Sequence, residues 1–184
     1  VGVFSAERKD RWHRIAFVHG VDAPRDTFLA ENERKPTEEF HGAGEIRKGY
    51  LADVGMGFYA CVEPMHGNQL VAYIRTREEP RRLLTDKLTE GHALACGDLI
   101  GVKSDQIVVG WRGTPGKEGS TIGLHVWTPL DAEGKEWRDT AVDDTGMACE
   151  DLQLADLDGD GKLDIIASGR ATKNVKIYFN ETPR

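Results

Sequence analysis

The chain has 184 residues, of which 39% are hydrophobic, and a formal net charge of −7. This length is enough for one domain with a substantial core, and the acidic balance without a basic stripe argues against a nucleic-acid-binding protein. No apolar run approaches membrane-spanning length, and no signal peptide is visible. The 21 glycines and 7 prolines favour short strands joined by tight turns.

Short segments of alternating apolar residues, typical of strands, run along most of the chain. The first are predicted at Val1–Phe4 and Trp12–Val18. Residues 21–40 follow no strand pattern and contain Pro24 and Pro36, which predicts a surface loop or short helix. Further strands are predicted at Asn68–Ile74, Arg82–Leu84, Gly123–Trp127, Trp137–Val142 and Asn174–Phe179.

An internal repeat organises these strands. Residues 97–109 align without gaps to residues 155–167, and residues 52–62 form a third, shorter copy. Each copy is an aspartate-containing turn followed by an apolar strand, and further strands come after it. Units of four antiparallel strands repeated in this way are the signature of β-propeller blades.

The predicted fold is therefore an all-β propeller of four-stranded antiparallel blades. Its predicted divisions are the end of a blade at 1–20, a loop insertion at 21–40, blades at 41–90 and 91–146, and a last blade with a calcium loop at 147–184. These make about three to four blades, whereas a propeller has at least four. The ring is thus incomplete or closed by assembly, and we expect the remaining blades in the same longer chain or in another copy.

Four aspartates crowd the last repeat copy, with Gly159 and Gly161 between them. Ca²⁺ prefers about six to eight oxygen ligands, and glycine permits the turns that aim several side chains at one point. The twelfth residue counted from Asp156 is Ala167, not the Glu of a helix-loop-helix calcium hand. The alternative is a polar turn without an ion. The predicted ligands are the side chains of Asp156, Asp158, Asp160 and Asp164 and the carbonyl of Lys162.

The motif from Asp156 to Ile166, of the form D-x-D-G-D-G-x-x-D-[IV], resembles the FG-GAP or VCBS-type repeats of calcium-binding β-propellers. The resemblance implies that this loop joins the first two strands of a blade and holds Ca²⁺. The middle copy departs from the motif, because Ile100, Val102 and Gln106 replace ligands, and the first copy keeps only Asp53. We therefore expect one filled site.

A weaker resemblance, to the propeller part of aldos-2-ulose dehydratase-like proteins, covers most of residues 50–180. It is carried by the phrases Glu63–Asn68, Glu90–Leu94, Val109–Arg112, Cys149–Asp151 and Gly169–Val175. It implies a carbohydrate lyase that removes water from keto-sugars such as 1,5-anhydrofructose by β-elimination, with a metal assisting. The cupin domains of such enzymes are absent from this sequence.

Propeller topology places the entries to the first strands, and the links between second and third strands, on the face opposite the aspartate loops. The predicted site there comprises His66, His92, Arg112, Glu150, Asp151 and Arg170, with Asn68 and Asn174 nearby. His92 or His66 would be the base, and Arg112 or Arg170 would stabilise an enolate. Glu150 and Asp151 could hold a second divalent ion or protonate the leaving hydroxyl. The alternative is that the histidines cap strands and that Arg170 and Asn174 only tie down their turn.

The expected function is carbohydrate binding or conversion by a calcium-stabilised propeller. The alternative is a non-catalytic module that binds a partner protein and uses calcium only structurally. We expect an extracytoplasmic location, secreted or periplasmic. Cys61, Cys96 and Cys149 are expected to behave as small hydrophobes rather than as a metal cluster, and the tryptophans at 111, 127 and 137 are expected to pack between blades.

Overall fold

The structure, a computed structural model, describes residues 2–8, 11–16, 43–74 and 81–183. Within these residues the protein is all-β, with 13 strands and no helix. The chain divides into two compact units, Val1–Ala43 and Gly44–Arg184. The predicted loop at 21–40 lies outside the described residues. None of the described residues forms a helix with the length and apolarity that crossing a membrane requires.

The first unit contains one hairpin. Strands β1 (Gly2–Arg8) and β2 (Arg11–Ala16) pair antiparallel from Gly2 opposite Ala16, with a register irregularity between Ala6 and Arg8. These strands overlap the two segments that the sequence predicted here.

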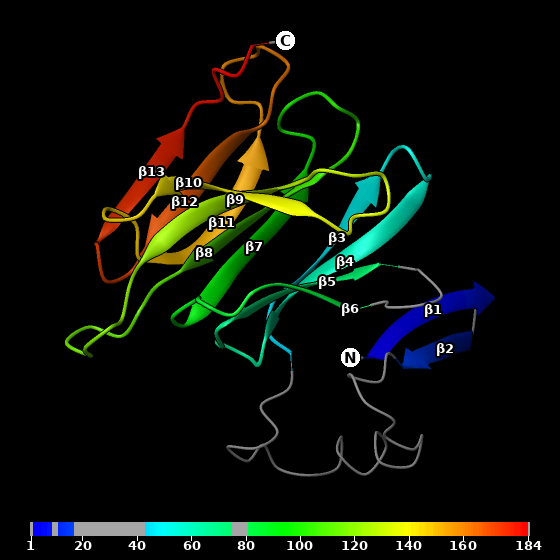
Figure 1. Ribbon diagram of the computed structural model, residues 1–184, viewed down its shortest axis with the longest axis horizontal. Helices are drawn as coiled ribbons and strands as arrows, with labels where there is room; N and C mark the ends of the chain where they lie inside the picture. Colours follow the sequence, from blue (N-terminus) through cyan, green and yellow to red (C-terminus); the bar gives the residue numbers. More distant parts are fainter. Residues whose placement is uncertain (1, 9–10, 17–42, 75–80, 184) are drawn as a thin grey trace. The chain divides into compact units, whose positions relative to one another are not determined.

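The second unit contains three antiparallel sheets, in each of which the strands are neighbours in chain order (Figure 1). The first sheet and the second have four strands each, and the third has three among the described residues. The all-β, antiparallel prediction is confirmed. The strands are β3 (Ile46–Leu51), β4 (Met56–Glu63), β5 (Gln69–Ile74) and β6 (Arg81–Thr85); β7 (Gly91–Gly97), β8 (Gln106–Trp111), β9 (Gly123–Pro129) and β10 (Trp137–Asp143); and β11 (Cys149–Ala155), β12 (Asp164–Gly169) and β13 (Asn174–Tyr178).

The middle sheet is covered on both faces, and its strand β8 is buried at every residue. Ile107 and Val109 belong to a cluster with Phe58 and other side chains of the β3–β6 sheet. Val108, which alternates with them, belongs to a second cluster with Met147 and other side chains near the β11–β13 sheet. The continuous apolar run of β8 therefore reflects a strand between two cores.

The tryptophans pack between sheets, as predicted. Trp111 and Trp127 are buried in the cluster shared by the first and second sheets. Trp137 packs against the same cluster, and its ring meets that of Phe58 edge to face with centroids 5.5 Å apart. Aromatic pairs of this geometry add to the stabilisation from burial alone.

The three cysteines are free thiols, as expected of small hydrophobes, and Cys61 and Cys149 are buried. Burial raises the pKa of the Cys149 thiol to about 12, so the thiolate that would ligate a metal is strongly disfavoured. Its Sγ occupies the space that a Cβ would need at Gly110 on β8. A glycine at this position therefore lets the second and third sheets approach closely.

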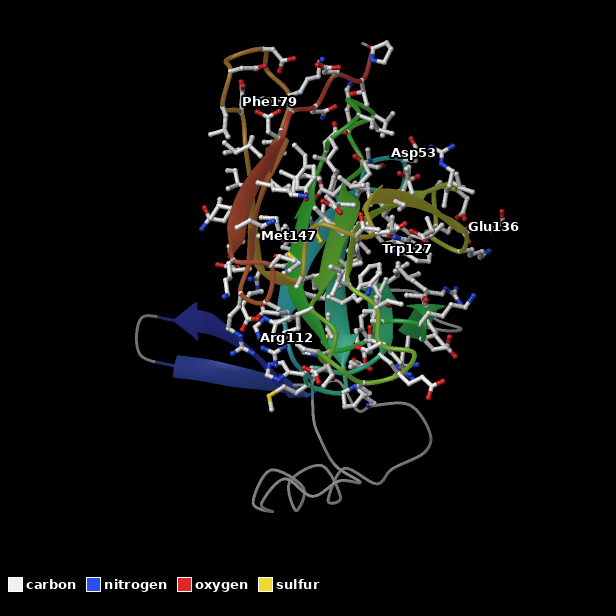
Figure 2. The ribbon with its side chains drawn as sticks, turned by 90° about the vertical axis from the view of Figure 1, so that its left-hand side faces the viewer. Asp53, Arg112, Trp127, Glu136, Met147 and Phe179 are labelled. Atoms are coloured by element: carbon white, nitrogen blue, oxygen red, sulfur yellow. The ribbon has the colours of Figure 1, made fainter. Side chains whose placement is uncertain are left out.

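The loops between first and second strands of the three sheets meet at one end of the second unit. The Ala52 amide donates to Ser104 Oγ at 2.9 Å, and the Asp105 amide donates to the Tyr50 carbonyl at 2.8 Å. Asn180, which follows β13, donates from Nδ2 to the Leu99 carbonyl at 2.6 Å. Figure 2 shows Phe179 at this end and Arg112 at the other. The two ends carry the two groups of predicted site residues.

Candidate functional site

The aspartate loop between β11 and β12 gathers three carboxylates. One oxygen each of Asp156, Asp158 and Asp164 lies within 4.8 Å of the others, a grouping that could hold a metal ion. Gly159 and Gly161 have φ values of 81° and 83°, which an L side chain rarely adopts. Oxygen-only ligands from a glycine-containing turn suit a hard cation such as Ca²⁺. The donor set therefore fits the ion that the sequence predicted.

Asp160 and Lys162, also predicted as ligands, lie outside this group of three. The Lys162 ammonium is 2.9 Å from Asp160 Oδ2 and donates to the Asn180 carbonyl at 3.1 Å. An ammonium at this position neutralises one of the four carboxylates. The roles of Asp160 and of the Lys162 carbonyl stay predictions.

The corresponding loop of the middle sheet closes without the carboxylate group. Gln106, which aligns with Asp164, is fully buried. Its Oε1 accepts hydrogen bonds from the Leu99 amide at 2.7 Å and the Ile100 amide at 3.2 Å, and its Nε2 donates to the Ser104 carbonyl at 2.7 Å. Asp164 accepts from the equivalent amide, that of Leu157, at 2.9 Å. A neutral amide thus fills the position that a carboxylate holds in the last sheet.

At the other end of the sheets, two β-bulges present His92 and Glu150. On β7 the register passes from Gly91 opposite Trp111 to Ala93 opposite Gly110, so His92 has no partner in the ladder. The same irregularity on β11 leaves Glu150 without one. Bulges re-aim side chains and are frequent beside active sites. His92 Nε2 and Glu150 Oε1 lie 3.8 Å apart.

Arg112, just after β8, joins two carboxylates in this region. Its Nε donates to Glu90 Oε2 at 3.1 Å, and its Nη1 donates to Glu150 Oε1 at 2.9 Å. Thr114 Oγ1 donates to the second oxygen of Glu90. The hydrogen bond from Thr114 is the largest cause of the lowered pKa of Glu90; burial opposes it, and the hydrogen bond and charge of Arg112 lower the pKa further. Glu90 is therefore held as a carboxylate.

The imidazoles of His66 and His92 stack on one another beside this network. Their ring centroids are 4.6 Å apart, with an interplanar angle of 19°. Burial lowers the pKa of His66, and the charges of His92 and Arg112 lower it further. His66 is therefore neutral near pH 7, which suits a proton acceptor. Both His66 and Glu90 have a φ of 56°, a conformation uncommon outside glycine and found at functional sites.

Two buried atoms of the site have no hydrogen-bond partner among the described residues: His92 Nδ1 and Glu150 Oε2. The Arg170 guanidinium is 3.8 Å from Glu150 Oε2 and its side chain is 73% exposed. Buried polar atoms are rarely left unsatisfied. These two atoms therefore give this end of the sheets hydrogen-bonding capacity that the described residues do not use.

The structure brings together five of the six predicted site residues at this end: His66, His92, Arg112, Glu150 and Arg170. Asp151 is exposed, and its carboxylate accepts a hydrogen bond from the Leu152 amide at 2.9 Å. Within the part of the chain that the structure describes, the only grouping of three metal-ligating side chains is in the aspartate loop. The predicted second ion near Glu150 and Asp151 stays a prediction.

Asn174 and Asn68 have structural contacts. Asn174 donates to the Gly146 carbonyl at 2.8 Å and accepts from Thr172 Oγ1 at 2.6 Å, so it ties down the β12–β13 turn. Asn68 donates to the Asp86 carbonyl at 3.0 Å. For Asn174, the structural alternative raised from the sequence holds.

Glu90 and Thr114 were not picked out from the sequence. Glu90 is two residues before His92 and belongs to a phrase that carried the weaker resemblance, which was the available signal. Thr114 gave none, because its contact depends on how the β8–β9 loop folds back toward Glu90.

No protein-family model, curated protein or solved structure matches the chain significantly.

Proposed function

We propose that the sheets of residues 44–183 are consecutive blades of an FG-GAP or VCBS-type β-propeller. Three features support this. Strands follow one another as neighbours within each sheet; the first strand of the middle sheet, β7, contacts the first strands of both other sheets, β3 and β11; and the sheets stack through two apolar clusters. Blades around an axis have these properties. The remaining blades would come from a longer chain or another copy.

The aspartate loop, in this proposal, holds one structural Ca²⁺ through Asp156, Asp158 and Asp164. Ca²⁺ at about 100 times its Kd would stabilise the folded state by about 2.7 kcal/mol, or about 5 to 10 °C in Tm for a chain of this size. EDTA should therefore lower Tm, and added Ca²⁺ should restore it. Asp158→Asn should remove most of the calcium response, whereas Asp139→Asn, at an exposed position on β10, should keep it. A Tm that ignores EDTA would contradict the ion.

The opposite end, in the same proposal, binds a carbohydrate. The observation that carries it is the joining of Glu90 and Glu150 by Arg112 beside the stacked histidines, with Glu150 Oε2 and His92 Nδ1 unpartnered among the described residues. Carboxylates, a guanidinium and imidazoles offer both acceptors and donors to neighbouring hydroxyl groups. The same groups include a neutral base and a cation, the requirements for β-elimination from a keto-sugar.

The test uses 1,5-anhydrofructose as the probe. Binding should shift the imidazole NMR signals of His66 and His92, and conversion should produce the ultraviolet absorbance of an enone. Glu150→Gln should abolish both effects, and Lys117→Gln, in the exposed β8–β9 loop, should leave them unchanged. Shifts without absorbance would support binding alone. If the folded protein gave neither the NMR shifts nor the absorbance, that result would favour the alternative of a protein-interaction module.

A further inference from the structure

Backbone hydrogen bonds join the start of the β8–β9 loop to the residues just before β7. The Arg112 amide donates to the Glu90 carbonyl at 3.2 Å, and the Gly113 amide donates to the Thr89 carbonyl at 2.9 Å. Gly113 has a φ of 63°, and a Cβ there would lie 2.5 Å from the Thr121 carbonyl oxygen. Only glycine adopts this backbone without strain. The side chains of Glu90 and Arg112 therefore extend from segments that are fixed against each other.

These side chains form a series of hydrogen bonds that runs from the loop to Glu150. Thr114 Oγ1 donates to Glu90 Oε1, and Arg112 Nε donates to Glu90 Oε2 at 3.1 Å. Arg112 Nη1 then donates to Glu150 Oε1 at 2.9 Å. The Arg112 side chain is only 15% exposed, and a planar guanidinium that is bound through two of its nitrogens keeps one orientation. Arg112 is thus held by Glu90 while it holds Glu150.

Glu150 Oε1 has a second polar neighbour in His92 Nε2. These two atoms lie 3.8 Å apart, beyond hydrogen-bonding distance, whereas the same oxygen is bonded to Arg112. The other polar atom of each side chain, Glu150 Oε2 and His92 Nδ1, is buried without a hydrogen-bond partner among the described residues. Arg112 therefore occupies the oxygen that His92 would otherwise approach, and it keeps the two side chains apart.

We propose that Glu90 and Thr114 are positioning residues that act on the carbohydrate site through Arg112. Arg112, fixed in this way, keeps Glu150 from pairing with His92. Glu150 Oε2 and His92 Nδ1 then bind two neighbouring hydroxyl groups of the sugar, since a carboxylate oxygen accepts from a hydroxyl and an imidazole nitrogen either accepts or donates. This assignment rests on the carbohydrate site proposed above. Without the guanidinium, Glu150 Oε1 pairs with His92 Nε2, and both side chains leave the positions that suit the ligand.

The first part of the test uses the protein without sugar and records the imidazole signals of His92 by ¹⁵N–¹H NMR. Arg112→Met should shift these signals, because Glu150 Oε1 becomes free to bond to His92 Nε2. Arg112→Lys should shift them less, because an ammonium keeps the charge but does not reproduce the two-nitrogen fork. Thr114→Val should shift them in the same direction by a smaller amount. Arg138→Met, the same change at an exposed position on β10, should leave them unchanged.

The second part measures affinity for 1,5-anhydrofructose by NMR titration. Thr114→Val removes the hydroxyl that donates to Glu90 and should weaken binding about three- to tenfold. Arg112→Met should weaken it more than about tenfold, and Arg112→Lys should restore part of the affinity. Thr140→Val, at an exposed position on β10, should bind as the wild type does. Because Thr114 acts only through Glu90, its effect reports positioning rather than contact with the sugar.

Two results would overturn the proposal: His92 signals of Arg112→Met that match those of Arg138→Met, and a Thr114→Val protein that binds the sugar as tightly as the wild type. Circular dichroism confirms that each variant folds, and Thr114→Val, the smallest change, serves in both parts if Arg112→Met does not fold. If the wild type itself does not respond to the sugar, the carbohydrate proposal fails. The sugar-free signals then decide alone whether Arg112 keeps Glu150 from His92.

Discussion

Replacing Arg112 by Met should lower the free energy of unfolding by about 2 to 3.5 kcal/mol. Arg112 donates to both Glu90 and Glu150, at 3.1 and 2.9 Å. Met retains most of the apolar stem but removes both donors. The carboxylates of Glu90 and Glu150, which share this one guanidinium, would lose their common donor and its positive charge.

The magnitude follows from how far each group is removed from water. The side chains of Arg112 and Glu150 are 15% and 26% exposed, so their hydrogen bond contributes about 1.5 to 3 kcal/mol, the range for bonds to charged groups. Glu90 is 37% exposed, and its pair adds about 0.5 kcal/mol, as surface pairs do. For a chain of this length, the sum of about 2 to 3.5 kcal/mol corresponds to a decrease in Tm of about 4 to 14 °C.

Urea unfolding followed by tryptophan fluorescence measures the difference. The matched control is Arg170→Met, because Arg170 is 73% exposed and 3.8 Å from the same carboxylate, outside hydrogen-bonding distance. It should cost less than about 0.5 kcal/mol. If Arg112→Met costs no more than the control, Arg112 does not hold the two carboxylates, and the reasoning about the site is wrong.

Three further results are expected. Measured by NMR, the His66 imidazole should titrate below the ordinary pKa of histidine, and His92→Ala should bring the His66 pKa closer to that value. Because the folded state disfavours protonation of His66, its contribution to the free energy of unfolding should fall as pH falls through the ordinary pKa of histidine. An unshifted pKa would refute this account. Gly110→Ala should destabilise the fold by about 1 to 3 kcal/mol through overlap with Cys149, measured by urea unfolding. The double variant with Cys149→Ala should recover only part of this loss, because it removes the Sγ contact but keeps the Cβ of residue 149, which is 2.5 Å from the added Cβ. Asp143, although burial opposes ionisation, has a pKa well below its usual range because hydrogen bonds from neighbouring side chains and amides outweigh burial; Asp143→Asn should therefore lower the unfolding free energy at neutral pH and lose its effect only in strong acid.

The antiparallel all-β organisation was predictable because it depends on local patterns. Alternation of apolar residues locates strands, and the repeated Asp98 and Asp156 turns set their spacing. Even the opposition of His92 and Glu150 follows from the repeat, because each residue precedes its aspartate by six positions. Equivalent positions in neighbouring sheets are brought close by the stacking of those sheets.

The network around Arg112 was harder to predict because its geometry is tertiary. The sequence offered Glu150 and Asp151 as equivalent neighbours, but the bulge on β11 turns only Glu150 toward Arg112. Glu90 reaches Arg112 from a left-handed backbone conformation, and no glycine or asparagine at that position indicated this conformation in the sequence. Thr114 depends on the path of a loop. Contacts that depend on a bulge and two loops produce no periodic pattern in the sequence, so they could not be predicted from it.

The buried amide of Gln106 gives the two corresponding loops different sensitivities to the environment. The loop of the middle sheet is held closed by the uncharged side chain of Gln106, which forms hydrogen bonds with three backbone groups. The last loop has three carboxylates within 4.8 Å of one another, whose mutual repulsion a bound cation would relieve. Under the proposed calcium site, ion withdrawal would loosen the β11–β13 sheet as a local unit while the other two sheets keep their shared core. Hydrogen exchange with and without chelator would then show a gradient of opening that starts at one side of the molecule.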